Sequence, residues 1–387
     1  MTKPTGGSWQ ESVLYSFSGP SRSYPRASLV LGSAGALYGT THSSTTSGTV
    51  FELAPPSVAG GVWTETVLYA FAGGGGNILD GAVLIGPGGT LFTTTQGNTT
   101  PGGTAVALAP PTAPGGSWTQ SVIYSFAHGG PGPGTSPYAG LVSEGAALYG
   151  TDYYGGDDYC SPSGCGVVYE LTPPATSGGA WTPTTLHMFT GWPGDGASPL
   201  DALTVGPGGV LYGTTYIGGT GSPTSCGPNG PGCGTVFQLT PPTAPGGAWT
   251  ESIIYTFTGE NGDGALPSGS VALGKNGEIY GTTSYGGSAT SGSPCSSGAI
   301  SGCGTVFELT PPPTPGGAWT ETVLHSFTGQ DGDGAIPLAV SLSVPQARST
   351  APRPPAARER APYSPSCRSA GAPRLSGARN KAYHVDS

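Results

Sequence analysis

The sequence predicts an all-β fold, namely a β-propeller of four-stranded blades in which five blades are complete and a sixth is incomplete. One text, LYGTT followed by GTVFEL and WTETVLYSF, returns five times with small changes, and a sixth copy begins. A tryptophan after Gly-Gly-X marks the copies at intervals of 54, 55, 63, 68 and 70 residues: Trp9, Trp63, Trp118, Trp181, Trp249 and Trp319. Units of this size are too small to bury a core alone, so neighbours must cover their faces.

Each copy contains four strand-like runs, and the fourth copy illustrates them. Gly206-Pro-Gly-Gly209 supplies the positive φ of a tight hairpin, and Pro241 and Pro242 end a strand because proline cannot donate to a ladder. A second Gly-Gly turn precedes the last run. The four strands predicted in this copy span 202–205, 210–215, 235–240 and 249–257.

The last strand of each copy carries apolar residues on both faces. In the fourth copy, Trp249, Ile253 and Phe257 share one face by the period of two, whereas Ile254 lies on the other. Both faces are therefore expected to be covered, as in a strand packed between neighbouring sheets. The predicted blades span 24–73, 79–128, 135–191, 194–259 and 262–329.

The segment 9–17 is an orphan fourth strand in this scheme. It could close the ring by joining the first three strands of a sixth blade that begins at Asp331. A parallel β-helix is the main rival architecture, although it does not need two glycine turns in each copy. A tandem array of sandwiches is disfavoured because each unit would lack a core of its own.

Charge separates the chain into two parts. Up to Ser343 there are four basic and 19 acidic residues, whereas eight basic and two acidic residues follow. The acidic part argues against nucleic acid as a partner, because phosphate binding needs clustered Lys and Arg. The basic tail alone could suggest a nucleic-acid or membrane arm.

A change of reading frame is the preferred explanation of this tail. The residues 342–352 can be encoded so that a two-base shift yields GSAGALYGT, the text of residues 32–40. We therefore expect a propeller domain at 1–340 and a disordered tail at 341–387, in which Cys367 is a product of the shifted frame. Sequencing of the gene tests this interpretation.

The repeated text resembles the GloVer tandem-repeat family, also called choice-of-anchor tandem-repeat proteins. The resemblance rests on LYGTT, GG, GTVFELTPP, the WTETVLYSF run and D-G-x-x-P in a fixed order over about residues 9–340. The second copy departs from it, with LFTT at 91–94 and AVAL at 105–108. The resemblance implies a bacterial secreted or surface-anchored protein with a propeller-like fold, and no established activity.

Cysteines occur in pairs, each just before the third strand of a copy: Cys160/Cys165, Cys226/Cys233 and Cys295/Cys303. Occurrence in twos favours disulfides and hence an oxidising compartment. Free thiols and zinc remain alternatives, although two ligands per loop would need a second donor pair. No apolar run approaches the length of a membrane span. The start at Met1 lacks the features of a signal peptide, so an extracellular location requires an earlier start.

One cluster breaks the repeat and is the predicted ligand site. Aromatic rings stack on the C–H faces of sugars and carboxylates accept hydrogen bonds from hydroxyls, so the cluster suggests glycan binding. Paired carboxylates could also hydrolyse a glycoside, and a decorated loop without function is the remaining reading. The six residues are Asp152, Tyr153, Tyr154, Asp157, Asp158 and Tyr159.

Other polar residues are assigned structural roles. Glu65, Glu251 and Glu321 recur at one position and are expected to be solvated, whereas His187 and His325 stand where other copies have Tyr and are expected to be packing variants. The Gly-Asp-Gly loops resemble pieces of a calcium loop, but none completes its ligand set. No catalytic residue, metal site or cofactor is predicted.

We therefore expect a non-catalytic extracellular or cell-surface repeat protein that binds a glycan or surface protein or forms part of a surface layer. A carbohydrate-active enzyme, a glycoside hydrolase or lyase on a propeller scaffold, is the alternative, and a decayed gene product is a third reading. The sequence leaves open the ligand, the anchor, the true start, the oligomeric state and the blade number of the intact protein.

Overall fold

The computed structural model of the chain describes most of the repeat region, and the statements below concern these residues. The predicted tail at 341–387 lies outside them. The described residues are 13–18, 24–42, 48–58, 60–71, 79–97, 102–113, 115–127, 134–156, 160, 163–176, 178–191, 193–220, 226, 232–244, 246–288, 295, 302–314, 316–330 and 333–338.

The regular secondary structure of these residues consists of short strands and three-residue 3₁₀ turns. The strands are β1 Val30–Leu31, β2 Leu37–Thr41, β3 Thr49–Ala54, β4 Thr64–Ala70, β5 Leu84–Ile85, β6 Leu91–Gln96, β7 Gly103–Ala109, β8 Thr119–Ser125, β9 Val142–Glu144, β10 Ala147–Asp152, β11 Val167–Thr172, β12 Thr182–Met188, β13 Gly196–Ala197, β14 Thr204–Val205, β15 Leu211–Thr215, β16 Ile217–Gly218, β17 Thr235–Thr240, β18 Thr250–Thr256, β19 Gly264–Pro267, β20 Ala272–Leu273, β21 Ile279–Gly286, β22 Thr305–Thr310 and β23 Thr320–Ser326. The 3₁₀ turns are η1 Ser33–Gly35, η2 Pro87–Gly89 and η4 Pro207–Gly209.

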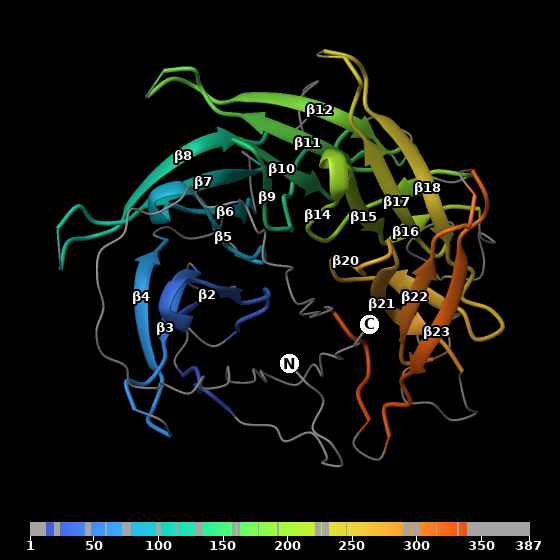
Figure 1. Ribbon diagram of the computed structural model, residues 1–387, viewed down its shortest axis with the longest axis horizontal. Coiled ribbons are helices and arrows are strands. Elements are labelled where there is room, and N and C mark those ends of the chain that lie inside the picture. Colours follow the sequence, from blue (N-terminus) through green and yellow to red (C-terminus); the bar gives the residue numbers. More distant parts are fainter. Residues whose placement is uncertain are drawn as a thin grey trace, which may run out of the picture.

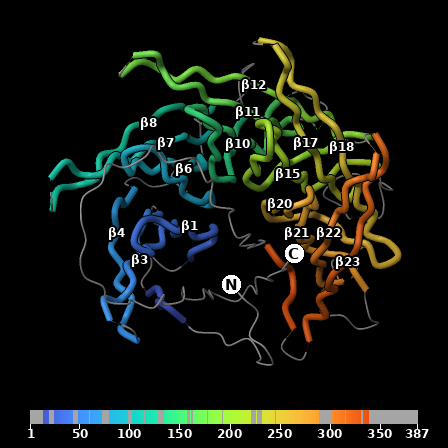
Figure 2. The backbone as a smooth tube through the Cα atoms, viewed as in Figure 1, coloured from blue at the N-terminus to red at the C-terminus, as the bar shows by residue number. Residues whose placement is uncertain are grey.

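Within the described residues, these strands form five four-stranded antiparallel blades arranged in a ring, which confirms the predicted propeller (Figure 1). The blades are β1-β2-β3-β4, β5-β6-β7-β8, β9-β10-β11-β12, β14-β15-β17-β18 and β20-β21-β22-β23. The short strands β1, β5, β9, β14 and β20 lie toward the centre of the ring, and β4, β8, β12, β18 and β23 lie outside. Figure 2 shows the same circular path from blue to red.

The predicted strands of the fourth copy all occur, with β14, β15, β17 and β18 inside the expected ranges. The first turn has the expected backbone, because Gly208 and Gly209 have φ of 71° and 76°. One feature was not predicted: the outer strand carries an extra residue in every blade. In the fourth blade it is Ile254, since Val236 pairs with Tyr255 and Phe237 pairs with Ile253. The bulge shifts the alternation of the strand, so Trp249 and Ile253 pack toward the third blade whereas Phe257 packs toward the fifth. This corrects the prediction that these three residues share one face.

Aromatic rings hold successive blades together. The ring of Phe126 lies 5.2 Å from Tyr169, Phe189 lies 5.1 Å from Phe237, and Phe257 lies 5.1 Å from Phe307, all measured between centroids. The residues in these pairs are almost completely buried. They form the core between blades, since edge-to-face rings add to the burial of apolar area.

The N-terminal segment makes the same contact with the first blade. Phe17 lies 4.9 Å from Phe51, and the Tyr15 hydroxyl donates to Glu65 Oε2 at 2.9 Å. The corresponding Tyr69 of the first blade donates to Gln120 of the second at 2.8 Å. Residues 13–18 therefore occupy, relative to the first blade, the place that a preceding outer strand would take.

The second blade shows how its divergent text is accommodated. In the other blades a glycine leaves room for an aromatic ring, and a Cβ on Gly213 would lie 2.6 Å from Phe237 Cζ. In the second blade Thr93 replaces the glycine and Val106 replaces the ring, and both are fully buried. The larger side chain on one strand is thus balanced by a smaller one on the next, so the core stays filled.

Threonine hydroxyls link neighbouring blades near the centre. The hydroxyl of Thr40 donates to the Gly81 carbonyl of the second blade at 3.1 Å, and Thr94 donates to the Ala139 carbonyl of the third at 2.6 Å. Thr151 donates to the Asp201 carbonyl of the fourth blade at 3.0 Å. These bonds satisfy inner backbone carbonyls, which accounts for the threonine at the fourth residue of the LYGTT text in these three copies.

The six cysteines form disulfides, as predicted. The bridges are Cys160–Cys165, Cys226–Cys233 and Cys295–Cys303, with Cα–Cα distances of 5.0, 5.2 and 5.0 Å. These distances lie within the range that a disulfide spans. All three bridges are in the third, fourth and fifth blades, whose variable loops are longer than those of the first two.

Removal of one bridge should destabilise its loop with little effect on the other blades. We expect the Cys226→Ser/Cys233→Ser variant to lose about 2–3 kcal/mol of unfolding free energy, because the bridge restricts the unfolded chain. Urea unfolding of variant and wild type measures the difference. A thiol assay on the unfolded, unreduced wild type should not modify these six cysteines, and six reactive thiols would contradict the disulfide assignment.

Candidate binding surface at the inner ends of the blades

Two positions of each blade differ from copy to copy while the framework around them is retained. One position lies just before the innermost strand, and the other follows the Thr-Thr or Thr-Asp pair of the second strand. Because these strands are antiparallel, the two positions lie at the same end of the blade. We call them the inner-end positions; they hold Arg26/His42, Asp80/Gln96, Tyr138/Tyr153, Leu200/Tyr216 and Ser268/Ser284.

The first two blades place charged and amide groups at these positions. His42 Nδ1 lies 2.8 Å from Asp80 Oδ1, and the Arg26 guanidinium lies 3.6 Å from the same oxygen. The Gln96 amide donates to Asp80 Oδ2 at 2.7 Å. Both carboxylate oxygens of Asp80 are thus engaged, while the side chain of Arg26 remains 59 % exposed. This cluster offers a ligand one exposed cation beside a carboxylate that neighbouring side chains hold in place.

The third and fourth blades place tyrosines at three of these positions, and a tyrosine directly follows the second position in the third and fifth blades. Tyr138 and Tyr153 lie 5.3 Å apart between ring centroids, and Tyr153 lies 4.6 Å from Tyr154. All three are half-buried. Burial raises the pKa of Tyr138, and the nearby Tyr154, Tyr153 and Asp80 raise it further. Asp80 therefore lies within electrostatic range of Tyr138. It connects the charged side chains of the first two blades with the tyrosines of the third.

The tyrosine group extends across blade boundaries. Burial raises the pKa of Tyr216 in the fourth blade, and the nearby Tyr285 of the fifth blade and Tyr153 of the third raise it further. These three residues come from three different blades, and Tyr285 and Tyr153 lie within electrostatic range of Tyr216. In the fifth blade itself the inner-end positions are closed by a short Ser268–Ser284 hydroxyl contact with an O–O distance of 2.5 Å. The aromatic surface is therefore Tyr138, Tyr153, Tyr154, Tyr216 and Tyr285.

The structure describes three of the six residues of the sequence-predicted site. Tyr153 and Tyr154 belong to this aromatic surface, whereas the Asp152 side chain points into the interior and the residue is 0 % exposed. Asp157, Asp158 and Tyr159 lie outside the described residues. The ligand-binding role of all six remains a prediction. Sequence reasoning missed Tyr138, Tyr216 and Tyr285, although comparison of the five copies at one position could have found them.

Asp152 breaks the repeat inside the core. Its position is a threonine in the other blades, where it shares a hydroxyl contact with a threonine of the third strand, as in Thr215–Thr235 at 2.8 Å. Here the third strand has Val167 instead. Neither carboxyl oxygen of Asp152 has a hydrogen-bond partner in the described part of the chain. Burial therefore raises the pKa of Asp152 well above its usual value.

Tyr169 breaks the repeat beside it, since it replaces the phenylalanine of other blades. Its hydroxyl is buried and also has no hydrogen-bond partner among the described atoms. Burial and the Asp152 carboxylate raise its pKa. Two extra polar groups thus lie together between the second and third blades, and Asp152 directly precedes Tyr153 of the aromatic surface in sequence.

The recurring glutamates are half-buried, which corrects the sequence-based expectation of solvated positions for Glu65, Glu251 and Glu321. The Oε1 atom of each is buried. Burial is the main cause that raises the pKa of Glu251 and of Glu321 to about 7. The Gly-Asp-Gly loops close as turns, since Asp263 Oδ2 accepts bonds from the amide and hydroxyl of Thr258, both at 2.7 Å.

Comparison with known families agrees with this architecture. Residues 45–294 match the family model of the Gloeobacter/Verrucomicrobia repeat, so the chain belongs to that family of repeat proteins. The resemblance drawn from the sequence is thereby confirmed. No curated protein matches the chain.

Similar solved structures are distant. An α-L-arabinofuranosidase from Lactobacillus brevis is 11 % identical, covers 75 % of this chain and 91 % of its own, and has a TM-score of 0.41. The catalytic domain of the Coprinopsis cinerea GH62 α-L-arabinofuranosidase is 14 % identical over 81 % of this chain and 98 % of its own, with a TM-score of 0.35. A Thermus thermophilus protein whose proposed identity is an oxidoreductase (glucose dehydrogenase) is 15 % identical over 82 % and 87 %, with a TM-score of 0.44. TM-scores this low support no functional assignment.

None of the helical turns in the described segments has the length or apolarity needed to cross a bilayer.

Proposed function

We propose that this protein is an extracellular binding module that recognises a carbohydrate at the inner ends of its blades. The observation that carries the proposal is the contrast between a retained framework and inner-end positions that change in every blade. Three of those positions hold Tyr138, Tyr153 and Tyr216, the ring centroids of the first two lie 5.3 Å apart, and another position holds Asp80. A purely structural repeat has no need for such variation.

Carbohydrate is the ligand class that this chemistry favours. Half-buried tyrosine rings offer apolar faces for the C–H surface of a sugar, while their hydroxyls can bond sugar hydroxyls. Asp80 is held by His42 and Gln96 and can accept further bonds. Asp157, Asp158 and Tyr159 follow Tyr154 in sequence, and we assign them to the same ligand surface. Asp152 would support this surface from the interior.

Glycan-array binding of the purified chain tests the proposal. Wild type should retain at least one glycan, and the Tyr153→Ala/Tyr216→Ala variant should lose at least tenfold in affinity because two stacking faces are removed. Tyr69→Phe, which changes only an outer-strand hydroxyl, is the matched control and should bind as wild type. A wild type that binds no glycan, or equal binding by the tyrosine variant, would contradict the proposal.

The alternative is a carbohydrate-active enzyme on the same scaffold, which the adjacent carboxylates of Asp157 and Asp158 favour. A reducing-sugar release assay on the glycans that bind separates the two functions. Release that disappears in Asp157→Ala or Asp158→Ala would favour the enzyme. Binding without release would favour the binding module.

Three disulfides support the proposed extracellular or cell-surface location, because such bridges persist in oxidising compartments. A surface protein is the second partner class we consider. Fractionation of the native host with an antibody to the repeat region should find the protein outside the cytoplasm.

A further inference from the structure

Three potential metal ligands meet between the third and fourth blades, on the outer side of the ring. His187 lies on β12, the outer strand of the third blade, and Glu251 lies on β18, the outer strand of the fourth. Asp195 lies in the loop that joins the two blades. One donor atom from each residue can be chosen so that all lie within 4.8 Å of one another. We call these three residues the rim triad.

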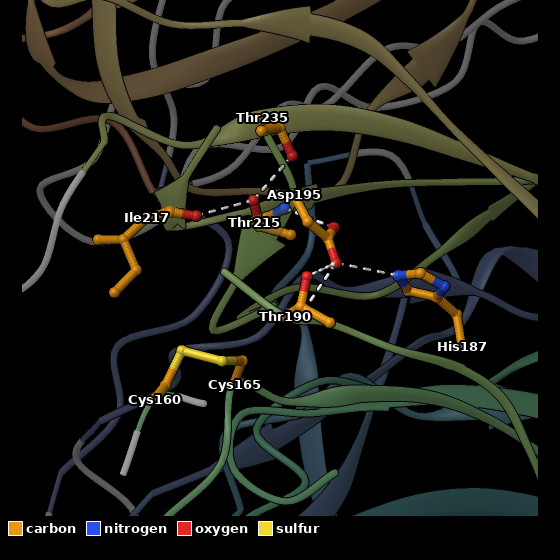
Figure 3. A network of polar contacts seen from close by, with 9 residues as sticks. Cys160, Cys165, His187, Thr190, Asp195, Thr215, Ile217 and Thr235 are labelled. Atoms are coloured by element: carbon orange, nitrogen blue, oxygen red, sulfur yellow. Dashed lines mark hydrogen bonds and ion pairs between the residues drawn. A yellow bond between two sulfur atoms is a disulfide. The ribbon is translucent and has the colours of Figure 1, made fainter. Parts of the chain in front are cut away.

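The loop holds Asp195 in place before any ligand arrives. Its Oδ2 accepts bonds from the Thr190 amide at 2.7 Å and the Thr190 hydroxyl at 3.0 Å, and its Oδ1 accepts one from the Gly196 amide at 2.6 Å (Figure 3). The neighbouring Phe189 packs edge-to-face against the His187 ring, with centroids 4.7 Å apart. Contacts of this kind fix the orientation of ligand side chains in metal sites.

The next interface contains a natural counterpart that lacks the histidine. Tyr255, Asp263 and Glu321 occupy the equivalent positions between the fourth and fifth blades. There burial raises the pKa of Tyr255, and the nearby Asp263 and Glu321 raise it further. A tyrosine hydroxyl can donate a hydrogen bond to a carboxylate, whereas the replacement of Tyr by His supplies a nitrogen that can act as a ligand.

The contact between His187 and Asp195 is longer than a hydrogen bond and is close to the spacing of two ligands on one ion. His187 Nε2 lies 3.6 Å from Asp195 Oδ2, which exceeds the usual hydrogen-bond length. Ligand atoms about 2.1 Å from a tetrahedral ion lie about 3.4 Å apart. His187 Nε2 and Glu251 Oε1 are both buried, and neither has a hydrogen-bond partner within the described residues.

We propose that the rim triad binds a divalent first-row transition-metal ion, of which Zn²⁺ is the probe, and that the ion joins the third and fourth blades. One imidazole nitrogen and two carboxylates form a donor set that such ions accept. The 4.8 Å spread of the donor atoms requires the side chains to close around the ion by about 1 Å. An ion held by two blades binds the folded ring only, so it stabilises that state.

The matched variants convert one interface into the other. Isothermal titration of the metal-stripped full chain with Zn²⁺ should give one more site in wild type than in His187→Tyr, which copies the natural counterpart. Tyr255→His should add a further site between the fourth and fifth blades. The thermal unfolding midpoint should rise with Zn²⁺ in wild type and return after EDTA, with no such rise in His187→Tyr.

Glu251→Gln keeps the size of the side chain and removes one anionic ligand, so it should weaken Zn²⁺ binding at least tenfold. This variant serves if His187→Tyr does not fold, as judged by circular dichroism. Equal Zn²⁺ stoichiometry and affinity in wild type, His187→Tyr and Glu251→Gln would overturn the proposal, as would absence of Zn²⁺ binding by wild type.

Discussion

Replacement of Asp152 and Val167 by threonine should stabilise the protein, and the gain should grow as the pH rises. The double variant Asp152→Thr/Val167→Thr copies the buried Thr215–Thr235 pair of the fourth blade. It removes a carboxyl group that has no hydrogen-bond partner among the described residues. We expect a gain of about 2–4 kcal/mol in unfolding free energy at pH 8, since buried unsatisfied and charged groups are unfavourable.

The pH dependence follows from the direction of the pKa shift. Burial raises the pKa of Asp152 in the folded protein, whereas the unfolded chain has the ordinary value near 4. Between these values the folded state binds more protons, so wild type loses up to about 1.4 kcal/mol of stability for each pH unit of increase. The variant lacks this loss. The difference should therefore be small at pH 4 and largest above the raised pKa.

Urea unfolding of wild type and variant at several pH values measures this difference, and the contributions of other raised groups such as Asp201 cancel in it. Asp152→Asn is the control, because it removes ionisation but keeps an unsatisfied polar group. It should lose the pH dependence without the full gain in stability. A wild-type pH profile in Asp152→Asn would contradict the interpretation.

Introduction of threonine at Gly213 should destabilise the fourth blade by about 3 kcal/mol, and Phe237→Val should relieve much of that effect. A Cβ at Gly213 would lie 2.6 Å from Phe237 Cζ and 3.0 Å from Leu203 Cδ2, so the single variant is overpacked. The second blade already contains the combination, as Thr93 and Val106, with both residues buried.

A double-mutant cycle by chemical denaturation tests this exchange. We expect the two substitutions to couple by about 2 kcal/mol in the favourable direction, as residues in contact do. Ser252→Thr, at an exposed position of β18, is the control and should change stability by less than about 0.5 kcal/mol. Additive effects of Gly213→Thr and Phe237→Val would show that the two side chains do not compete for the same space.

The repeat made the architecture predictable from the sequence. Five copies of one pattern locate the strands independently, so the end of β17 at Thr240 before Pro241 was clear. Residue identity gave less information about register. The extra residue at Ile254 follows from how neighbouring blades twist and pack, and an apolar run such as Ile253-Ile254 reads the same with or without a bulge.

The candidate sites were predictable only in part. Tyr153 and Tyr154 stood out because they interrupt the repeat, whereas Tyr138, Tyr216 and Tyr285 looked ordinary within their own copies. Their proximity depends on the ring that brings different blades together. The rim triad was missed for the same reason, since His187 read as a packing variant and Glu251 as a solvated residue. Burial between two blades changes both readings.

The separation of a retained framework from the inner-end positions has a consequence for engineering and evolution. Each blade contributes only two such residues. The bond from Thr40 to Gly81 does not involve them, whereas the His42–Asp80 contact joins the first two blades through them. The inner-end residues of one blade can be replaced by those of another, for example Ser268/Ser284 placed in the third blade or Tyr138/Tyr153 placed in the fifth. Such an exchange would change the proposed binding surface and leave the scaffold intact. New binding specificities can thus arise when two residues are exchanged between copies of the repeat within one gene.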